Sequence, residues 1–325
     1  MSKKLPLTLA CGDYEITRPL KLGQVEPEGI DLTVLDIGSR ERHWRMARGN
    51  EFDICEFNIC AYFMAKDRGV PWTSLPVFLH RRFRHGFVFV NTTKKIKTPK
   101  DLIGARVGGT NFTPAGNMWI RGILEEDYGV PHRKIVWVTE RDEDVDFKPP
   151  KGLQIERVDA GTLDERLVSG ALDAMISPSF PKSFLKGDKR VDRLFRDNKA
   201  VEIEYFRKTG IFPIMHVTAI KQDVLDKYPW VANNMVAAFD KAKAIAYRKT
   251  QNPRTAPIAW VRNALEEQEA VLGPDPWEYG LGPRNRKNLE TALKYTFQQG
   301  LIRRRPKLDE LFVNTDLPIG DSESF

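Results

Sequence analysis

Residues 210–220 read GIFPIMHVTAI, a run rich in residues that favour β-structure. A second run of this kind, FRHGFVFVN, occupies residues 83–91. The chain between the two runs, residues 101–210, alternates strand-like and helical segments and could form an α/β unit of its own. We therefore expect the chain to leave one lobe at the first run and to return to it at the second.

The rest of the chain also alternates between strands and helices, which predicts an α/β fold. Thr113 is placed to cap a helix that has Pro114 at its first position and Gly129 just beyond its end. A longer helix is predicted from apolar residues at helical spacing between Val231 and Ile245. The strands predicted in the first hundred residues are 6–11, 29–37, 52–56 and 86–91.

These segments predict a two-lobed α/β fold with two crossovers between the lobes. Lobe one would comprise residues 1–95 and 215–325, and lobe two residues 96–214. The two β-rich runs would then lie at the floor of a ligand cleft between the lobes. A chain of 325 residues is long enough to give each lobe a hydrophobic core.

Composition and charge narrow the classes of function. Hydrophobic residues make up 41% of the chain and charged residues 29%, which is typical of a globular protein, and the formal net charge is +7. The basic clusters RRFR (81–84), KKIK (94–97) and RRR (303–305) lie far apart and lack interleaved aromatic residues, so we expect no nucleic-acid partner. The positive charge favours either a solvated basic surface or a cleft for a small carboxylate.

The first residues allow two interpretations. Lys3 and Lys4, a short apolar run from Leu5 to Ala10, and Cys11 resemble the start of an exported, lipid-anchored protein. The same run could be the first strand of a cytosolic domain. The apolar run is shorter than the roughly 7–15 residues that an export signal needs, and no run approaches the roughly 18 that span a membrane. Three cysteines without CxxC spacing also favour a reducing compartment, so we expect a cytoplasmic protein.

Several short motifs occur in a characteristic order along nearly the whole chain. They are CGDY at 11–14, EFD at 51–53, FRH at 83–85, WIRGIL at 119–124, YGVP at 128–131 and TGIFPIMH at 209–216. In this order the motifs resemble the 4,5-dihydroxyphthalate decarboxylase family, which has the type 2 periplasmic-binding-protein fold. The resemblance implies a carboxy-lyase that converts 4,5-dihydroxyphthalate to protocatechuate and carbon dioxide without an organic cofactor.

Such a reaction makes definite chemical demands. The ring carbon that bears the carboxylate must accept a proton, and a partly deprotonated hydroxyl para to it can neutralise the charge that develops. Each carboxylate of 4,5-dihydroxyphthalate is para to a hydroxyl, so the substrate supplies its own electron source. The protein must then provide anchors for the retained carboxylate, a base near a hydroxyl and an acid near the ring carbon.

We predict His85 and His216 as the residues that move protons. Both lie in the β-rich runs, and histidine is the side chain best suited to exchange protons near neutrality. Asp13 and Glu56 follow the first and third predicted strands and could act as a base or orient a histidine. Purely structural roles, in backbone hydrogen bonding or turn capping, remain open for all four. The other histidines, His43, His80 and His132, are expected at the surface or in loops.

Two kinds of group could anchor a carboxylate. The guanidinium groups of Arg18, Arg82 and Arg84 can pair with it, unless they are solvated surface residues. The turn of Thr110, Asn111 and Thr113 offers backbone N–H groups at the start of a helix. Ser177 and Ser179 follow a predicted strand and could also contact substrate, or could serve only the turn around Pro178.

Two histidines and two carboxylates make a divalent metal chemically possible, but no HxxxH-type spacing favours one, so we expect neither a metal nor a cofactor. A non-enzymatic solute-binding protein for an aromatic or dicarboxylic acid is the alternative to an enzyme, because fold does not dictate function. The resemblance also implies a homo-oligomer, and the sequence predicts no membrane partner.

Overall fold

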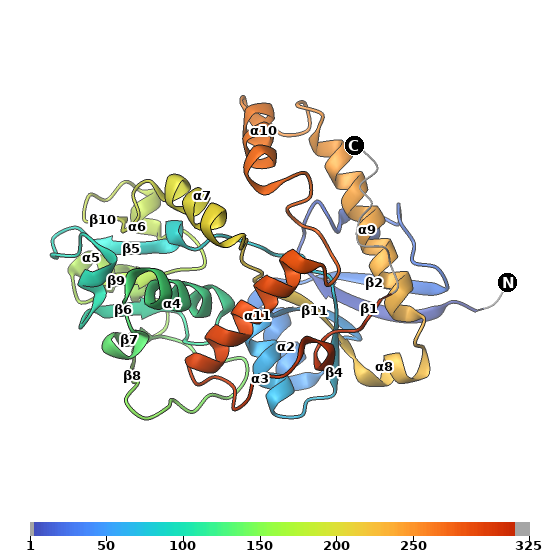
Figure 1. The fold of residues 1–325 in the computed structure, drawn as a ribbon, viewed down its shortest axis with the longest axis horizontal. Helices are drawn as coiled ribbons and strands as arrows, with labels where there is room; N and C mark the ends of the chain where they lie inside the picture. The colour runs from blue at the N-terminus through green and yellow to red at the C-terminus, as the bar shows by residue number, and fades with distance from the viewer. Residues whose placement is uncertain (1–2, 316–325) are drawn as a thin grey trace. The chain divides into compact units, whose positions relative to one another are not determined.

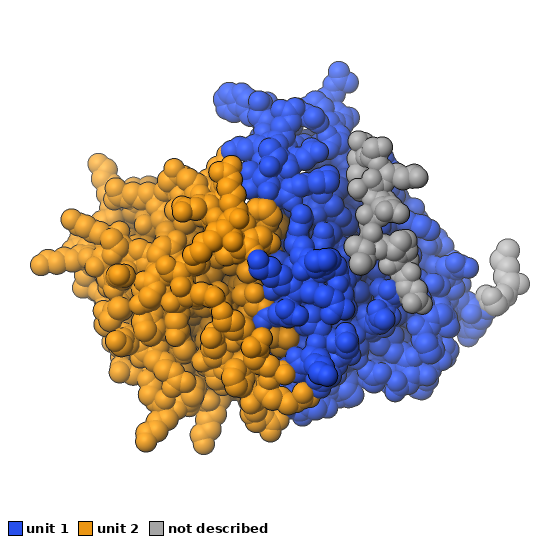
Figure 2. Space-filling view, in the orientation of Figure 1, with its two compact units in different colours: residues 1–81, 214–290, 306–325 blue, residues 82–213, 291–305 orange. Residues whose placement is uncertain are grey.

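The protein consists of two compact units in a computed structural model that describes residues 3–315 (Figure 2). Among the described residues, unit 1 contains 3–81, 214–290 and 306–315, and unit 2 contains 82–213 and 291–305. Strand β5 (Val88–Asn91) pairs with strands of unit 2, so the chain enters this unit at Arg82 and not after residue 95 as predicted. The return at Ile214 falls next to the predicted position, but the sequence did not predict that residues 291–305 belong to unit 2.

Unit 1 is built on one mixed sheet (Figure 1). Its strands are β1 (Leu5–Cys11), β2 (Ile30–Asp36), β3 (Ile54–Asn58), β4 (Trp72–Leu75) and β11 (His216–Lys221). The strand order is β2-β1-β3-β11-β4, in which β1 is parallel to both of its neighbours and β11 is antiparallel to both of its own. The first three predicted strands are confirmed, whereas the run at 210–220 forms regular strand only from His216 onward.

Six helices belong wholly to unit 1. They are α1 (Arg18–Lys21), α2 (Ser39–Gly49), α3 (Ile59–Asp67), α8 (Gln222–Lys227), α9 (Val231–Thr250) and α10 (Val261–Leu272). The long helix predicted from Val231 is confirmed as α9, and Val231, Met235 and Phe239 are fully buried in a cluster with Leu9 of β1. Burial of its apolar stripe explains why this segment forms a helix of 20 residues.

Unit 2 is built on a second mixed sheet with strand order β10-β5-β9-β6-β7-β8. Besides β5, its strands are β6 (Arg106–Gly109), β7 (Val136–Thr139), β8 (Gln154–Arg157), β9 (Ala174–Ile176) and β10 (Val191–Arg193). β6 is parallel to both β7 and β9, so the carboxyl ends of β6 and β9 meet at one edge of the sheet. Phe89, Val138 and Leu167 are buried in the core of this unit.

The helices of unit 2 are α4 (Ala115–Tyr128), α5 (Leu163–Ser169), α6 (Lys182–Leu185) and α7 (Asn198–Thr209). A further helix, α11 (Pro283–Gln298), begins in unit 1 and ends in unit 2. Short 3-10 helices are formed by His85–Phe87, Pro99–Leu102, His132–Lys134 and Leu308–Glu310. Helix α4 ends at Gly129 with a φ of 66°, as predicted, but its N-cap is Pro114. Thr113 does not cap the helix because its hydroxyl donates to Glu143.

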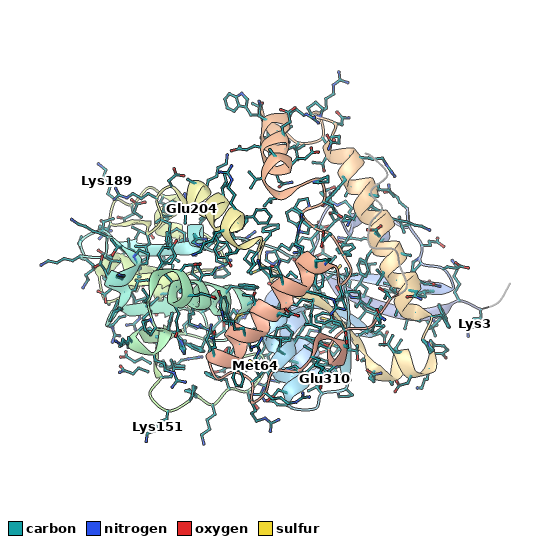
Figure 3. All side chains as sticks on the ribbon, in the orientation of Figure 1. Lys3, Met64, Lys151, Lys189, Glu204 and Glu310 are labelled. Carbon is teal, nitrogen blue, oxygen red and sulfur yellow. The ribbon has the colours of Figure 1, made fainter. Side chains whose placement is uncertain are left out.

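Apolar side chains lie inside the protein and charged side chains lie at its surface. Met64 of α3 is fully buried, whereas Lys151 and Lys189 project outward from unit 2 (Figure 3). Cys11, at the end of β1, is buried, which confirms that the apolar run before it is a strand. Within residues 3–315, none of the helices combines the length and the apolar character needed to cross a bilayer.

Gly122 of the WIRGIL motif allows α4 and the final part of α11 to approach closely. A Cβ atom added at Gly122 would lie well inside van der Waals contact with the ring of Tyr295. The Tyr295 hydroxyl donates to Glu126 at 2.5 Å, so the ring is held in place. The motif therefore has a packing explanation at this position.

Replacement of Gly122 with alanine should lower the free energy of unfolding by about 1–2 kcal/mol. Overpacking against Tyr295 should outweigh the roughly 1 kcal/mol that alanine gains over glycine inside a helix. Urea unfolding followed by circular dichroism measures the change. Gly38→Ala is the control, since a Cβ atom there meets nothing within 4 Å, and it should shift stability by less than about 0.5 kcal/mol. Equal losses in the two variants would contradict the packing explanation.

Candidate active site

Glu56 and His216 come from two adjacent antiparallel strands of unit 1. Strands β3 and β11 pair with Glu56 opposite Thr218 and with His216 opposite Asn58. Glu56 and His216 are therefore diagonal neighbours on one face of the sheet, where long side chains can meet. All five residues of β3 are buried, so the register that covers its apolar side chains also brings this carboxylate to the histidine.

The carboxylate of Glu56 accepts four hydrogen bonds. Its Oε1 accepts from the hydroxyl of Tyr14 at 2.8 Å and contacts Nδ1 of His216 at 2.5 Å. Its Oε2 accepts from the backbone N–H of Gly12 at 2.9 Å and from Nη2 of Arg42 at 2.7 Å. An ionised carboxylate has about four acceptor positions, so these donors use its whole capacity.

These contacts fix the charge of Glu56 and the tautomer of His216. Burial by itself raises the pKa of the Glu56 carboxyl, but the charge of Arg42 and the hydrogen bonds from His216 and from the N–H of Gly12 together hold that pKa below its usual range. Glu56 is therefore an ionised acceptor, and Nδ1 of His216 must carry the hydrogen of their shared bond. The lone pair of the neutral imidazole is then on Nε2, which becomes its basic atom.

Arg42 of α2 fixes Glu56 to the sheet by more than its charge. Both side chains are completely buried. Besides the ion pair, Nε of Arg42 donates to the backbone carbonyl of Glu56 at 2.9 Å, and Nη1 donates to the carbonyl of Ile37. Arg42 therefore holds both the main chain and the carboxylate of the same residue.

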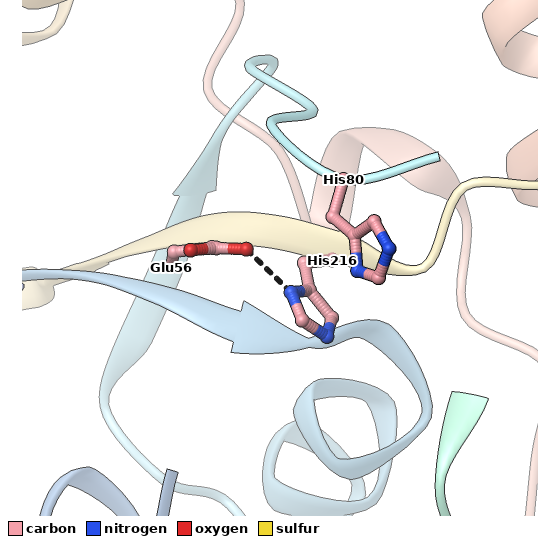
Figure 4. Close-up of side chains that lie close together, drawn as sticks. All are labelled: Glu56, His80 and His216. Atoms are coloured by element: carbon pink, nitrogen blue, oxygen red, sulfur yellow. Dashed lines mark hydrogen bonds and ion pairs between the residues drawn. The ribbon is translucent and has the colours of Figure 1, made fainter. Parts of the chain in front are cut away.

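Two further imidazoles pack edge-to-face against His216. The ring of His80 lies 4.7 Å from that of His216 between centroids, and the ring of His43 lies 4.9 Å away (Figure 4 shows His80, His216 and Glu56). The expectation that His43 lies at the surface or in a loop is wrong, because it belongs to helix α2 and only 5% of it is exposed. Burial, followed by the nearby His216, holds the pKa of His43 well below its usual value.

His80 is half-buried in a loop, as expected. The remaining histidine, His132, was also expected at the surface or in a loop, but it is buried in a 3-10 helix with its Nδ1 at 2.7 Å from the carboxylate of Glu125. The contact with Glu125 partly offsets the free-energy cost of removing the His132 ring from water. Unit 2 thus contains a second histidine–glutamate contact, in which the histidine is buried and the glutamate is exposed.

Glu56, His80 and His216 each have one ligand atom within 4.8 Å of the others, as in a site for a divalent metal. The donor set does not suit a metal, however. The oxygens of Glu56 already accept four hydrogen bonds, and the guanidinium of Arg42 on Oε2 would repel a cation. Two imidazoles alone fall short of the three protein ligands of a catalytic zinc site. The expectation of no metal and no cofactor stays a prediction.

The structure places the other predicted residues of unit 1 at the surface. Asp13 is exposed and forms ion pairs with Arg18 at 3.0 Å and with Lys21 at 3.7 Å. Arg18 also pairs with Glu15 at 2.7 Å, so its guanidinium already has two carboxylates. Glu56 lies inside β3 and not just after it, because the strand continues to Asn58. Of the predicted catalytic residues, the structure brings Glu56 and His216 together.

His85 belongs to unit 2, in the 3-10 helix His85–Phe87. Its ring lies among those of Tyr128, Phe195 and Tyr205, and only 1% of the residue is exposed. Neither ring nitrogen has a hydrogen-bond partner in the described part of the chain. Burial lowers the pKa of His85 to about 4, so the ring is neutral at neutral pH. That His85 and His216 both transfer protons to or from one substrate stays a prediction.

The turn of Thr110, Asn111 and Thr113 follows the carboxyl end of β6 and already holds a carboxylate of the protein. Glu143 accepts from the backbone N–H groups of Phe112 at 2.6 Å and Thr113 at 3.0 Å, and from the hydroxyl of Thr113 at 2.5 Å. The amides that we predicted for a substrate carboxylate are thus occupied by an internal one.

Arg82, Arg84, Ser177 and Ser179 are brought together in unit 2. Nη2 of Arg84 donates to the carbonyl of Ser177 at 2.9 Å, and Nη1 of Arg82 donates to the carbonyl of Pro178 at 3.3 Å. The hydroxyl of Ser177 accepts from the N–H of Ser179 at 3.3 Å, as in an ordinary turn. Ser177 follows β9, so this loop lies at the same edge of the sheet as the turn after β6.

Sequence reasoning missed Arg42, Tyr14 and Gly12 as partners of Glu56. Arg42 precedes the buried Met46 by four residues on α2, so a charge on the apolar face of that helix was a signal that could have been noticed. Tyr14 and Gly12 carry no comparable signal, because their contacts with Glu56 depend on how the strands pair.

The comparisons with known proteins agree with this architecture. Residues 22–147 match the family described as NMT1/THI5 like. A sulfonate-binding protein from Methylobacillus flagellatus has a TM-score of 0.60 at 13% identity, over 97% of this chain and 93% of that one. The periplasmic aliphatic sulphonate-binding protein of Escherichia coli has a TM-score of 0.58 at 12% identity, over 95% and 97%. At such identities the likeness shows the fold alone: two α/β units of the type found in periplasmic binding proteins, as predicted.

Two curated relatives are closer in sequence. A 4,5-dihydroxyphthalate decarboxylase from Comamonas testosteroni is 31% identical over 319 residues, which cover 95% of this chain and 96% of the relative. A protein of the same name from Pseudomonas putida is 33% identical over 212 residues, covering 63% of this chain and 82% of the relative. The resemblance seen in the short motifs is therefore confirmed over almost the full length, and this chain belongs to the 4,5-dihydroxyphthalate decarboxylase family.

Proposed function

We propose that this protein is a carboxy-lyase that converts 4,5-dihydroxyphthalate to protocatechuate and carbon dioxide. Both curated relatives carry the name of that activity. The observation that carries the proposal at the level of residues is the contact of His216 Nδ1 with the ionised carboxylate of Glu56, which Arg42 holds in place. This arrangement supplies the proton-transfer group that the reaction requires.

In the proposed mechanism Nε2 of His216 accepts the proton of the hydroxyl that is para to the departing carboxylate. Glu56 stabilises the imidazolium that forms, because the positive charge then lies next to a buried negative one. The phenolate pushes electron density toward the carbon that bears the carboxylate, and this carbon takes up a proton. The bond to the carboxylate then breaks, its electron pair restores the aromatic ring with a phenolate oxygen, and carbon dioxide leaves. The imidazolium of His216 returns its proton to that oxygen.

The balance requires one proton from solvent and no oxidant or reductant. The electrons of the broken C–C bond end in the ring, and the new C–H bond uses the added proton. We therefore propose a reaction without a cofactor. The role of His85 as the proton donor to the ring carbon stays a prediction, as do the roles of Asp13 and of the hydroxyl groups of Ser177 and Ser179.

A non-enzymatic solute-binding protein is the competing function. It is supported by the fold alone, since the neighbours with this fold include sulfonate-binding proteins. A binding protein has no need of a histidine whose tautomer is fixed by a buried carboxylate. The contact between Glu56 and His216 therefore favours the enzyme.

A cytoplasmic location is part of the proposal. Cys11, Cys55 and Cys60 are all buried as free thiols, which is the usual state of cysteines in a reducing compartment. Fractionation of native cells with an antibody tests the location. Self-association also stays a prediction, and sedimentation of the purified protein tests it.

The activity itself is tested with purified protein and 4,5-dihydroxyphthalate, with the product followed by chromatography and carbon dioxide followed in a coupled assay. We expect equal amounts of protocatechuate and carbon dioxide. Tight binding of the substrate without any product would contradict the enzyme and favour the solute-binding function.

His216→Gln should lower kcat by about 10²–10⁴-fold, because glutamine can still donate to Glu56 but cannot accept the proton of a hydroxyl. The matched control is His132→Gln, which alters the buried histidine paired with Glu125 in unit 2 and should leave kcat within about twofold. Steady-state kinetics with circular dichroism spectra of both variants measure the effect. Comparable losses of kcat in the two variants, or none in either, would rule out His216 as the base.

Arg42→Met should destabilise the protein by about 3–5 kcal/mol at neutral pH, because the charge of Glu56 would remain buried without its cation. In the wild type the lowered pKa of Glu56 means that its ionised form stabilises the fold above the usual value of 4.5, and that this contribution is lost as pH falls through the folded-state pKa. Without Arg42, burial should raise that pKa instead. The cost of the substitution should therefore be larger at pH 7 than at pH 4.

Urea unfolding of the wild type and the variant at both pH values measures this difference. In the double variant Arg42→Met with Glu56→Gln no charge is left behind, so it should recover part of the lost stability at pH 7. A cost that is independent of pH and is not relieved in the double variant would show that Arg42 acts only by packing.

A further inference from the structure

Arg84 of unit 2 is a buried cation that forms no ion pair within the described chain, although the charge of Glu202 acts on it from a distance. Only 3% of the residue is exposed. Nη2 donates to the carbonyl of Ser177, and Nε is buried with no acceptor at all. Nη1 makes no hydrogen bond in the described chain either. A buried charge in this state is costly unless a partner arrives from outside the chain.

The first turn of α4 adds to the positive potential at Arg84. A Cβ atom added at Gly116 would lie 2.7 Å from Cζ of Arg84 and 2.8 Å from both Nε and Nη2. Nearly equal distances place that position over the face of the guanidinium, so the N–H edges remain available. Helix α4 has 14 residues and no acidic side chain in its first turn, so the positive end of its dipole adds to the potential at the cation, and Glu143, which is bound to the turn before the helix, offsets part of this potential.

A second guanidinium and two aromatic rings border the same place. Cζ of Arg84 lies 4.6 Å from the centre of the Phe87 ring, and Cζ of Arg82 lies 5.0 Å from it. The ring of Phe180 stacks on Phe87 at 5.3 Å and is 39% exposed. Burial, and next the charge of Arg82, lower the pKa of Arg84 to about 9, while Glu202 acts in the opposite direction. An anion attached to a flat ring would relieve the repulsion, and its ring could lie against the exposed part of Phe180.

The other predicted anchors do not share this state. Arg18 already has the carboxylates of Asp13 and Glu15, and the amides at Thr113 hold Glu143. Arg82 is exposed, so water solvates its charge. Arg84 is the member of the predicted set that is buried and forms no ion pair in the described chain.

We propose that Arg84 and the first turn of α4 form the receptor for a carboxylate of an aromatic acid, with Phe87 and Phe180 as the surface against which the ring lies. The inference deepens the proposed function, on which its choice of ligand rests. It assigns the recognition of a carboxylate to Arg84 among the arginines that the sequence singled out. Gly116 is then required because any side chain there would displace the guanidinium.

The test measures binding of phthalate by calorimetry in phosphate-free buffer. Phthalate lacks the hydroxyl groups that assist decarboxylation, so binding is observed without turnover. Arg84→Met should weaken phthalate binding by about 10–100-fold, which corresponds to the loss of a hydrogen-bonded charge. Arg18→Met is the matched control and should change the Kd by less than about twofold. Uncharged dimethyl phthalate should show no difference between Arg84→Met and the wild type.

A second substitution covers the case in which Arg84→Met does not fold. Gly116→Ala leaves the arginine in place but displaces its guanidinium, and it should weaken phthalate binding about tenfold with an unchanged circular dichroism spectrum. Binding as tight as that of the wild type in a folded Arg84→Met or Gly116→Ala variant overturns the proposal.

The outcomes separate this inference from the proposed function. Phthalate binding that depends on Arg84, in a protein that releases no carbon dioxide from 4,5-dihydroxyphthalate, would support the receptor and reject the decarboxylase. Turnover of 4,5-dihydroxyphthalate, together with phthalate binding that is unchanged in Arg84→Met, would support the decarboxylase and reject the receptor.

Discussion

The candidate site of unit 1 depends on one interaction, the buried ion pair between Arg42 and Glu56. A carboxylate with no exposed surface would ordinarily take up a proton, and a protonated Glu56 could no longer impose a tautomer on His216. The guanidinium, together with the N–H of Gly12 and the hydroxyl of Tyr14, keeps the carboxylate charged. Arg42 thereby also determines that Nδ1 of His216 carries the hydrogen of the shared bond.

Stability alone does not account for this arrangement. A buried ion pair gives a protein little net stability, since apolar residues of similar volume usually serve as well or better. An apolar pair cannot, however, fix the proton of a histidine or stabilise the imidazolium that forms when it accepts another. The cost of burying Arg42 and Glu56 is therefore better explained by the chemistry of His216 than by the fold. The same reasoning explains why Arg42 also holds the main chain of Glu56, since a proton-transfer pair tolerates little movement.

The sequence predicted the parts of the structure that have a local pattern. Apolar strands at 6–11 and 29–37 and the helix from Val231 were confirmed, because burial of a stripe or run of side chains is visible in a window of ten to twenty residues. The first boundary between the units was predicted after residue 95, but it lies at Arg82. The prediction was too late in the chain because only pairing with distant strands assigns β5 to unit 2. For the same reason Glu56 and His216 could be singled out separately, but their contact follows from the register of β3 and β11, which no local pattern encodes.

The sequence does not show which charged side chains form ion pairs in the folded protein. Arg18 and Arg84 were equivalent candidates on sequence alone, since each can bind a carboxylate. In the folded chain Arg18 is half-exposed and pairs with two carboxylates, whereas Arg84 is enclosed by Phe87 and Gly116 and forms no ion pair within the described residues. Water and the two carboxylates already satisfy Arg18, and no carboxylate in the described chain contacts Arg84. An arginine gains most from an incoming carboxylate where the protein has removed its solvent without supplying an anion, and this condition separates a binding residue from a surface residue of the same kind.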